Sequence, residues 1–568
     1  MKSDEKSEYL YKIRHSAEHI FNQAIEELWP GKILRAIGPA IDEGFYNDSR
    51  WLVEISEEKF PEIEKRMQEI VDANLPFVKK VISVNEAKDM FQANPFKQEL
   101  ISEFDPNEEI TLYYTGDPKK GKEVFVDLCA GPHVDSTGEV KAFKLLSVAG
   151  AYWRGREKNE MLTRVYGTAF PSKEELDNYL FVLEEAKKRD HKKLGKELSL
   201  FMFHETSPGM PYWLPKGLKM YNELVKYWRE EHDKHNYQEI VSPLLNKTDL
   251  YVTSGHWEHY KDDMFIADMG ENEVYGLKPM NCPNAMLVFG SKTRSYKDLP
   301  LRLSDTDRLH RYERSGTLNG LFRARSFQQD DSHNYITEDM IDSEYQHVFE
   351  LCEKFYSIFG LTYSFRLGTR PEKFIGEAKT WDKAEAILKV VLEKSGKDYY
   401  ILDGDGAFYG PKVDILMKDS LGREWQMGTI QLDFQQPARF GLKYVDIDGS
   451  EKTPVVIHRV IYGTLERFIG ILIEHFAGVF PVWISPVQVQ IIPISEKFNG
   501  YARKIADNLR KEGVRVEIDE NDETMSNKIR KAQEQKVPYM LIVGGKEEEN
   551  QTVSVRYRDG KQANLIDL

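Results

Sequence analysis

Charged and aromatic side chains that could hold a nucleotide are concentrated between residues 308 and 335. The segment RLHRYERSGTLNGLFRARSFQQDDSHNY carries Arg311, Glu313, Arg323, Arg325 and Phe327. On a strand, the spacing of two between Arg311 and Glu313 would put both side chains on one face. The guanidinium could then hold a phosphate while the carboxylate accepts from an amino-purine edge. The competing interpretation is a solvated hairpin, because runs of charge usually lie at the surface.

Three possible metal ligands stand in or beside this region. They are Cys282 in MNCPNAM, His333 in QQDDSHNY and His458 in VIHRVIYG. Two imidazoles and a thiolate suit zinc, and three protein ligands leave a position open for another molecule. Spacings this long have no specificity of their own, so each residue taken alone is more often packed in the core or exposed.

A second group of reactive side chains lies near the N-terminus. HSAEH puts His15 and His19 one helical turn apart, and DLCAGPH supplies Asp127, Cys129 and His133. The HxxxH and CxxxH pattern fits a zinc hydrolase or a metal-free acid–base site about equally. Buried histidines of a structural helix are the third interpretation.

Composition limits the classes of protein that can carry these groups. A chain of 568 residues is too long for one core and predicts about three or four domains. The net charge of -15 argues against a general nucleic-acid coat, so any RNA contact must be local. Three cysteines exclude a disulfide scaffold. The first fifteen residues lack an apolar leader segment and no stretch is long enough to span a bilayer, so we expect a cytoplasmic protein without membrane contact.

Periodicity predicts the elements that must position these residues. Residues 5–28 and 57–74 read as helices, and residues 33–46, ITLYYTG and EVFVDLC as extended segments of an α+β domain. Residues 172–197 have helical periodicity, with acids near the start and bases near the end, and predict a linker helix. After Pro486 strands and helices alternate, which predicts a small parallel or mixed sheet.

The nucleotide segment has a partner in GTLERFIGILIEHF, residues 463–476, which carries Glu466 and Arg467. The two resemble motifs 2 and 3 of the class II aminoacyl-tRNA synthetases, and SPLLNKTDLY from Ser242 resembles motif 1, whose proline lies at the homodimer interface in that family. The chain has neither a GxxxxGK[ST] loop nor a Rossmann glycine pattern. The resemblance implies ATP with Mg²⁺ and assigns the following roles: Arg311 to the α-phosphate and the amino-acid carboxylate, Glu313 to the adenine amino group, Arg323 to the γ-phosphate, and Phe327 with Arg467 to the two faces of the adenine.

Within that class the segments around Cys282, His333 and His458 resemble those of threonyl-tRNA synthetases. The resemblance implies one Zn²⁺ per subunit on these three residues, a polar wall for threonine made of Gln329, Asp331, Tyr409 and Gln431, and a charge-neutralising role for Lys412, with Arg311, Lys412 and Arg467 as the catalytic residues. Threonine could bind the metal through its amine and hydroxyl, whereas valine offers only a methyl group and should be rejected at the first step. NCPNAM departs from the family in Asn284 and Ala285, where Gly-His is common.

Serine keeps the hydroxyl and lacks one methyl, which is worth only about 10- to 200-fold in binding. A hydrolytic second site is therefore expected. The N-terminal segments resemble the editing domain of bacterial-type threonyl-tRNA synthetases, which implies an editing site of His15, His19, Lys97, Asp127, Cys129 and His133. We favour general acid–base chemistry through water, without a bound metal.

The C-terminal pattern resembles the anticodon-binding domain shared by threonyl, prolyl, histidyl and glycyl enzymes. The resemblance implies that Glu547 and Arg556 read unpaired anticodon bases. The small ubiquitin-like TGS domain that often precedes the editing domain is not found, and the chain stops at NLIDL where relatives usually continue into a last helix.

Together these features predict a multidomain α+β protein. We expect an α+β editing domain at 1–171, a linker helix at 172–197, a class II antiparallel-sheet catalytic core at 198–484 and an α/β anticodon-binding domain at 485–568. The expected activity is ATP-driven ligation of threonine to tRNA(Thr) by a homodimer, with hydrolysis of seryl-tRNA(Thr). The alternatives are an RNA-binding regulatory protein that lost catalysis, disfavoured because the site residues survive, and a stand-alone deacylase, which the intact nucleotide segments make unnecessary.

Overall fold

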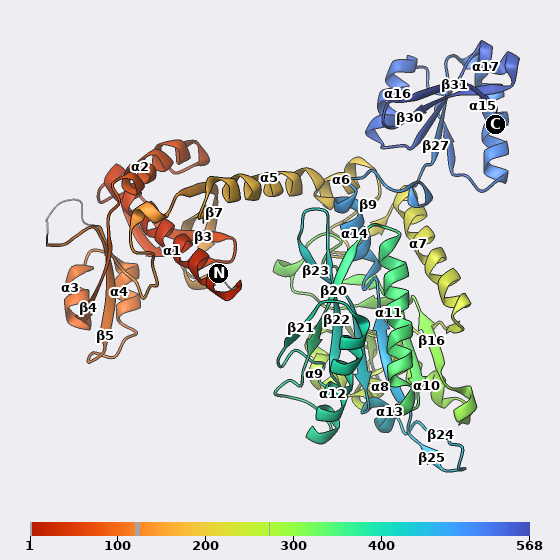
Figure 1. The fold of residues 1–568 in the computed structure, drawn as a ribbon, viewed down its shortest axis with the longest axis horizontal. Helices are drawn as coiled ribbons and strands as arrows, with labels where there is room; N and C mark the ends of the chain where they lie inside the picture. The colour runs from red at the N-terminus through yellow and green to blue at the C-terminus, as the bar shows by residue number, and fades with distance from the viewer. Residues whose placement is uncertain (1–2, 120–124, 272, 568) are drawn as a thin grey trace. The chain divides into compact units, whose positions relative to one another are not determined.

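The computed structural model describes residues 3–119, 125–271 and 273–567, which fall into two compact units, Met1–Glu184 and Glu185–Leu568 (Figure 1). Both units mix helices and sheets, as the sequence predicts. Among the described residues, no helix combines the length and the apolar character needed to cross a lipid bilayer.

Helix α1 (Ser3–Leu28) forms the centre of the first unit. Its buried apolar residues recur every three or four positions, as in Ile13, Ala17, Ile20 and Ala24, so one face packs into the core. Helix α2 (Phe60–Asp72) packs beside it, and the two helices confirm the helical periodicity of residues 5–28 and 57–74. The sheet beneath α1 is antiparallel, in the order β1–β3–β8–β7 with β2 paired to β3; its strands are β1 (Ile33–Ile37), β2 (Ala40–Ile41), β3 (Gly44–Trp51), β7 (Ala142–Tyr152) and β8 (Met161–Phe170).

A smaller layer completes this unit. It has an antiparallel sheet of β4 (Phe77–Ser83), β5 (Glu109–Thr115) and β6 (Phe125–Leu128), with α3 (Val84–Met90) and α4 (Pro95–Ile101). ITLYYTG is confirmed as strand β5, and EVFVDLC as β6 from Phe125 onward, its first two residues lying outside the described residues. The loop after β6 returns toward α1.

The predicted single linker helix is wrong in one respect, because the segment forms two helices, α5 (Lys173–Arg189) and α6 (His191–Glu197). Asp190 ends the first and caps the second, since its carboxylate accepts from the backbone N–H groups of Lys192 and Lys193. His191 is buried, where its Nδ1 donates to Glu474 Oε1 at 2.8 Å. These bonds fix α6 to the second unit.

An eight-stranded sheet dominates the second unit (Figure 1). Its order is β11–β16–β19–β26–β23–β22–β20–β21, and only the two edge pairs are parallel. This confirms the predicted antiparallel catalytic core. The strands are β11 (Tyr237–Glu239), β16 (Leu301–Asp305), β19 (Asp331–Ile336), β20 (Thr362–Gly368), β21 (Tyr399–Leu402), β22 (Lys412–Lys418), β23 (Glu424–Asp433) and β26 (Val455–Val460).

One large apolar core joins this sheet to its long helices, which are α7 (Pro215–Lys234), α11 (Ile341–Ser357), α12 (Ala378–Ser395) and α14 (Leu465–His475). Shorter helices are α8 (Thr248–Ser254), α9 (His256–Tyr260), α10 (Cys282–Gly290) and α13 (Gln436–Arg439). Two small sheets have two strands each: β9 (Phe201–Met202) pairs with β10 (Tyr212–Trp213), and β17 (Arg308–His310) pairs with β18 (Ser326–Gln328). Two others have three strands each. In one, β14 (Val274–Leu277) lies between β12 (Leu245–Lys247) and β13 (Ile266–Asp268), and in the other, β24 (Tyr444–Val445) lies between β15 (Arg294–Ser295) and β25 (Glu451–Lys452).

The C-terminal part confirms the predicted alternation and mixed sheet. Strands β27 (Val489–Pro493), β28 (Val516–Ile518) and β29 (Tyr539–Val543) are parallel, and β30 (Thr552–Tyr557) and β31 (Gln562–Asp567) add antiparallel pairs. The connecting helices are α15 (Asn499–Lys511), α16 (Met525–Glu534) and α17 (Gly545–Asn550).

Candidate functional site

The register of the large sheet places four polar side chains in one row. Lys412 lies opposite Gln431, Gln431 opposite His458, and His458 opposite His333. Directly opposed residues of antiparallel strands point to the same face, so residues 19, 27 and 125 positions apart in the sequence become neighbours. The row lines a cavity of about 460 Å³, and Asp331, two residues before His333 on β19, lines it too.

Cys282 completes a possible metal site on this row. It is the first residue of α10, and its Sγ, one His333 nitrogen and one His458 nitrogen lie within 4.8 Å of one another, all three residues being buried. The His458 Nε2–H donates to Asp433 Oδ2 at 2.9 Å, whereas His333 Nδ1 is buried and finds no hydrogen-bond partner within the described part of the chain. This donor set, with one orphaned ring nitrogen, fits a zinc ion.

Burial sets the protonation of this cluster. It raises the pKa of Cys282 well above its usual value and lowers the pKa of His333 well below its usual value. The protein alone therefore holds a thiol and a neutral imidazole, and a dication would displace the thiol proton on binding. The departure at Asn284 and Ala285 leaves this geometry intact, since both are buried in α10 behind Cys282.

The predicted polar wall is assembled around the same cavity, because Gln329, Asp331, Tyr409 and Gln431 all line it. The Tyr409 hydroxyl donates to Gln431 Oε1, and Asp331 Oδ2 accepts from Asn281 Nδ2 at 3.1 Å. Burial raises the pKa of Asp331 to about 6. The Asp331 carboxylate, held in place by Asn281, can therefore accept a hydrogen bond from a small polar ligand in the cavity.

Lys412 also faces the cavity but is already paired. Its Nζ lies 2.9 Å from Asp405 Oδ2 and 3.1 Å from Asp414 Oδ2. An anionic ligand must therefore compete with two carboxylates for this ammonium group.

The nucleotide segment departs from its predicted form. Strand β17 ends at His310, so Arg311 and Glu313 do not share a strand face. Arg311 lines the cavity, donates from Nε to the Pro279 carbonyl at 3.2 Å, and stacks 5.2 Å from the centre of the Phe327 ring. Glu313 pairs with Arg323 at 2.8 Å. The hairpin geometry bends the chain after β17 and turns Glu313 toward the opposite arm of the loop.

Arg467 brings a third guanidinium to this region from the first turn of α14. Its Nε donates to the Phe322 carbonyl at 3.0 Å. Burial, and then the charges of Arg323 and Arg311, lower the pKa of Arg467, while Glu313 acts in the opposite direction. Guanidinium groups that repel one another in this way would be stabilised by a polyanion. An adenine stack between Phe327 and Arg467 stays a prediction.

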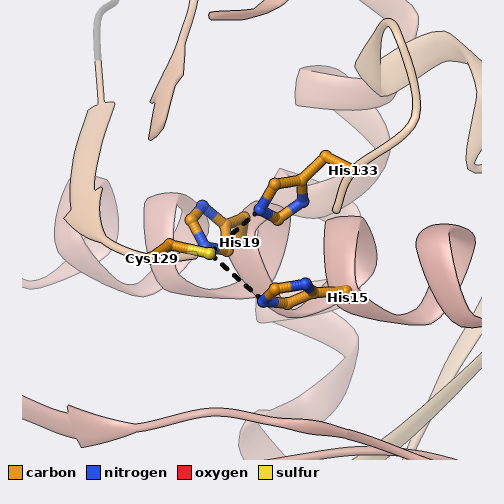
Figure 2. A group of neighbouring side chains, drawn as sticks. All are labelled: His15, His19, Cys129 and His133. Atoms are coloured by element: carbon orange, nitrogen blue, oxygen red, sulfur yellow. Dashed lines mark hydrogen bonds between the residues drawn. The ribbon is translucent and has the colours of Figure 1, made fainter. Parts of the chain in front are cut away.

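The predicted N-terminal residues also come together, and all of them except His133 line a cavity of about 370 Å³. Figure 2 shows His15, His19, Cys129 and His133 converging from helix α1 and the loop after β6. Cys129 Sγ lies 3.3 Å from His15 Nε2 and 3.2 Å from His133 Nε2. Lys97 Nζ and Asp127 Oδ1 form a buried ion pair of 2.7 Å that lines the same cavity.

The hydrogen bonds of this cluster indicate its tautomers. His15 Nδ1 lies 3.1 Å from the Pro132 carbonyl, to which it must donate, so its Nε2 presents a lone pair to Cys129. Burial lowers the pKa of all three histidines and raises the pKa of Cys129 to about 12. Neutral imidazoles that carry lone pairs can bind a water as acceptors, or a cation, since the four ligand atoms lie within 4.8 Å of one another.

Glu18 is the main residue of this cavity that sequence reasoning missed. It lies between the two histidines of HSAEH, is fully buried, and accepts from Asn22 Nδ2 at 2.7 Å and Asn47 Nδ2 at 2.9 Å. A Cβ on Gly38 would lie 1.6 Å from Glu18 Oε1, which explains the glycine there. The sequence feature that could have identified Glu18 is its position three residues after His15, on the same face of the helix.

Sequence reasoning also missed polar residues around the Cys282 cluster. Asp433 holds His458, Asn281 holds Asp331, and the buried His256 places its Nε2 3.9 Å from Cys282 Sγ. Asp305 lies opposite Asp331 on β16. Nothing in their local sequence distinguishes them, because their partners are distant along the chain.

The two predicted anticodon residues lie on neighbouring elements. Glu547 in α17 accepts from the Gly544 N–H at 3.0 Å and from Ser554 Oγ at 2.7 Å. Arg556 lies on β30, with a buried Nε that has no partner among the described residues. Their contact with RNA stays a prediction.

Known families match three parts of the chain. The model described as "tRNA synthetase class II core domain (G, H, P, S and T)" matches residues 265–476, "Anticodon binding domain" matches 488–568, and "Threonyl and Alanyl tRNA synthetase second additional domain" matches 110–166.

Whole-chain relatives agree with these matches. The threonine–tRNA ligase of Thermotoga maritima is 51% identical over 557 residues, which cover 98% of this chain and 86% of that protein. The ligase of Acetivibrio thermocellus is 51% identical over 96% of this chain and 85% of its own length. The solved RNA-binding domain of threonyl-tRNA synthetase from Cryptosporidium parvum superposes with a TM-score of 0.65 at 42% identity, covering 66% of this chain and 95% of that one.

The stability of α1 should depend on pH through Glu18. Burial raises the pKa of Glu18 from 4.5 to about 8. Between these values the folded protein holds a proton that the unfolded chain releases, so stability falls as pH rises from 4.5 to about 8 and levels off above. Glu18→Gln removes this titration. Hydrogen–deuterium exchange of α1 should show wild type losing protection relative to the variant across this window, and parallel profiles would contradict the assignment.

Proposed function

This chain belongs to the threonine–tRNA ligase family, and we propose that the cavity on its eight-stranded sheet is where threonine and ATP react. The activity is ATP-dependent ligation of threonine to tRNA(Thr), with hydrolytic editing in the N-terminal unit. The observation that carries the proposal is the row of Lys412, Gln431, His458 and His333, which shares one cavity with Cys282 and with Arg311 of the nucleotide segment.

Cys282, His333 and His458 would hold one Zn²⁺ per subunit. The orphaned His333 nitrogen and the Asp433 bond to His458 support this set. A bound ion would supply a Lewis acid, and three protein ligands would leave room for the amino acid to bind it. Asp331 and the Tyr409–Gln431 pair would bind the polar groups of threonine, and a ligand without a hydroxyl would leave them unsatisfied.

The arginines would position the triphosphate. Arg311 lies at the border between the cavity and the hairpin, so it can contact both the amino-acid carboxylate and the α-phosphate. Attack of the carboxylate on the α-phosphorus develops negative charge, which Arg311, Arg467 and Lys412 would stabilise together with Mg²⁺ bound to ATP. Arg323 would release Glu313, its ion-pair partner in this structure, and bind the γ-phosphate instead.

Zinc content tests the metal site. We expect about one zinc per purified wild-type chain and near-complete loss in Cys282→Ala, measured by elemental analysis. Cys352→Ala is the matched control, because Cys352 is equally buried but lies in the apolar core on α11. Zinc retained in Cys282→Ala but lost in His15→Ala would instead place the metal in the N-terminal cluster.

ATP–pyrophosphate exchange tests the substrate. Exchange should depend on threonine and fall roughly 10²- to 10³-fold in Arg311→Ala, because one charge-stabilising donor is removed. Arg314→Ala, an exposed arginine of the same loop, should leave the rate nearly unchanged. Exchange driven by proline or serine but not by threonine would reassign the amino acid.

The N-terminal cavity would hydrolyse seryl-tRNA. His15 and His133 would hold the attacking water with neutral ring nitrogens, while Lys97 and Asp127 would orient the ester end of the tRNA. The proposed reaction needs no metal, because neutral imidazoles can bind the water and transfer its proton themselves.

Deacylation should separate the two activities. In His133→Ala, hydrolysis of preformed seryl-tRNA(Thr) should fall roughly 10²- to 10⁴-fold, because an acid–base group is lost. Threonine-dependent exchange in the same variant is the internal control and should be unchanged. If His133→Ala hydrolysed seryl-tRNA(Thr) at the wild-type rate, this cluster would have no part in the editing reaction.

The remaining assignments are proposals of the same kind. Glu547 and Arg556 would read the anticodon from the C-terminal mixed sheet. A homodimer is supported by the exposed apolar run at Val241, Leu244 and Leu245 around Pro243. The division at residues 171, 197 and 484, and a cytoplasmic location, stay predictions.

A further inference from the structure

We propose that Asp305 is a positioning residue of the zinc site, the outer carboxylate that receives the second ring N–H of His333. The inference rests on the proposed binding of a cation by Cys282, His333 and His458. It concerns how that cation is held and adds a residue to which no role has been assigned.

Asp305 occupies a defined place beside the cluster. It is the last residue of β16 and lies directly opposite Asp331 on β19, so it is diagonal to His333. A carboxylate oxygen of Asp305, one of Asp331 and a ring nitrogen of His333 all lie within 4.8 Å of one another. Asp305 is 1% exposed, so bulk water does not solvate it.

Two complementary side chains lack a side-chain partner. Among the described residues the Asp305 carboxyl group has no side-chain hydrogen-bond partner and only the backbone N–H of Asp307 acts on it, while His333 Nδ1 has no partner. A carboxylate accepts and a ring N–H donates. A His333 ring nitrogen lies within 4.8 Å of an Asp305 carboxylate oxygen, so one bridging water can join the two side chains.

The other histidine of the site already shows this arrangement. His458 donates its Nε2–H to Asp433 Oδ2 at 2.9 Å. Histidines that ligate a metal usually donate their other ring nitrogen to such an acceptor, which fixes the ring and makes it a better ligand. Asp305 would do for His333 what Asp433 does for His458.

A purely structural role does not account for Asp305. The ammonium group of Lys278, whose charge acts on Asp305, is held by Asp307 Oδ2 at 2.5 Å and Ser242 Oγ at 2.8 Å. A buried carboxyl group without a side-chain partner costs stability, so the fold alone gives no reason for it. A dication nearby supplies the reason, because it favours a neighbouring negative charge.

The test compares zinc affinity with stability in the full-length chain. In Asp305→Asn, zinc affinity measured by competition with a chromophoric chelator should fall roughly 10- to 100-fold. The midpoint of unfolding of the metal-free variant should not fall, because asparagine is an uncharged isostere. Asp419→Asn is the matched control: Asp419 is a buried carboxylate that binds Arg423 and Trp425, so this variant should lose stability but keep its zinc affinity.

Three results would overturn the inference. Unchanged zinc affinity in Asp305→Asn would remove Asp305 from the site, and failure of the metal-free variant to fold would make it structural. Loss of a second equivalent of metal, with the first unaffected, would indicate a separate cation at Asp305 and Asp331. If Cys282→Ala also keeps its zinc, the proposed cation site is itself wrong, and this variant distinguishes that failure from a failure of Asp305 alone.

Discussion

The register of four antiparallel strands is the constraint on which the catalytic half of this protein depends. Direct opposition of Lys412, Gln431, His458 and His333 puts a cation, two possible metal ligands and an amide in one line. A slip of one residue in any strand would turn its members toward the opposite face. The register is held by the apolar core and by Asp330, whose buried carboxylate accepts from the backbone N–H groups of Ile461, Tyr462 and Gly463.

Burial disfavours charged groups at both cavities, with different consequences. At the sheet, burial and the like charges of Arg323 and Arg311 lower the pKa of Arg467, so a bound anion is favoured. At the N-terminal cavity it keeps three imidazoles and a thiol neutral. The first environment suits charge developing on a phosphate, and the second suits a water held by lone pairs. The same desolvation therefore prepares two different reactions.

The presence of two cavities follows from what threonine shares with its competitors. A site that satisfies buried polar groups with a hydroxyl rejects valine strongly, because valine leaves those groups unpaired. It cannot reject serine strongly, since one missing methyl is worth only about 1–3 kcal/mol. A hydrolytic site in a separate unit corrects this error, and the matched editing domain provides its scaffold.

Local periodicity was sufficient for much of the architecture. The apolar spacing of α1, the alternation of the C-terminal sheet and the α+β character of both units are properties of short segments, and the family resemblance located the residues that meet at each cavity. Other features depended on contacts between distant residues. Asp190 breaks the linker helix because it caps α6, and Glu313 lies beyond the end of β17, where it pairs with Arg323. Glu18, Asp433 and Asp305 resemble ordinary acidic residues in sequence. Only the packing of strands and helices buried them, and burial is what decides the protonation and partners of a carboxylate.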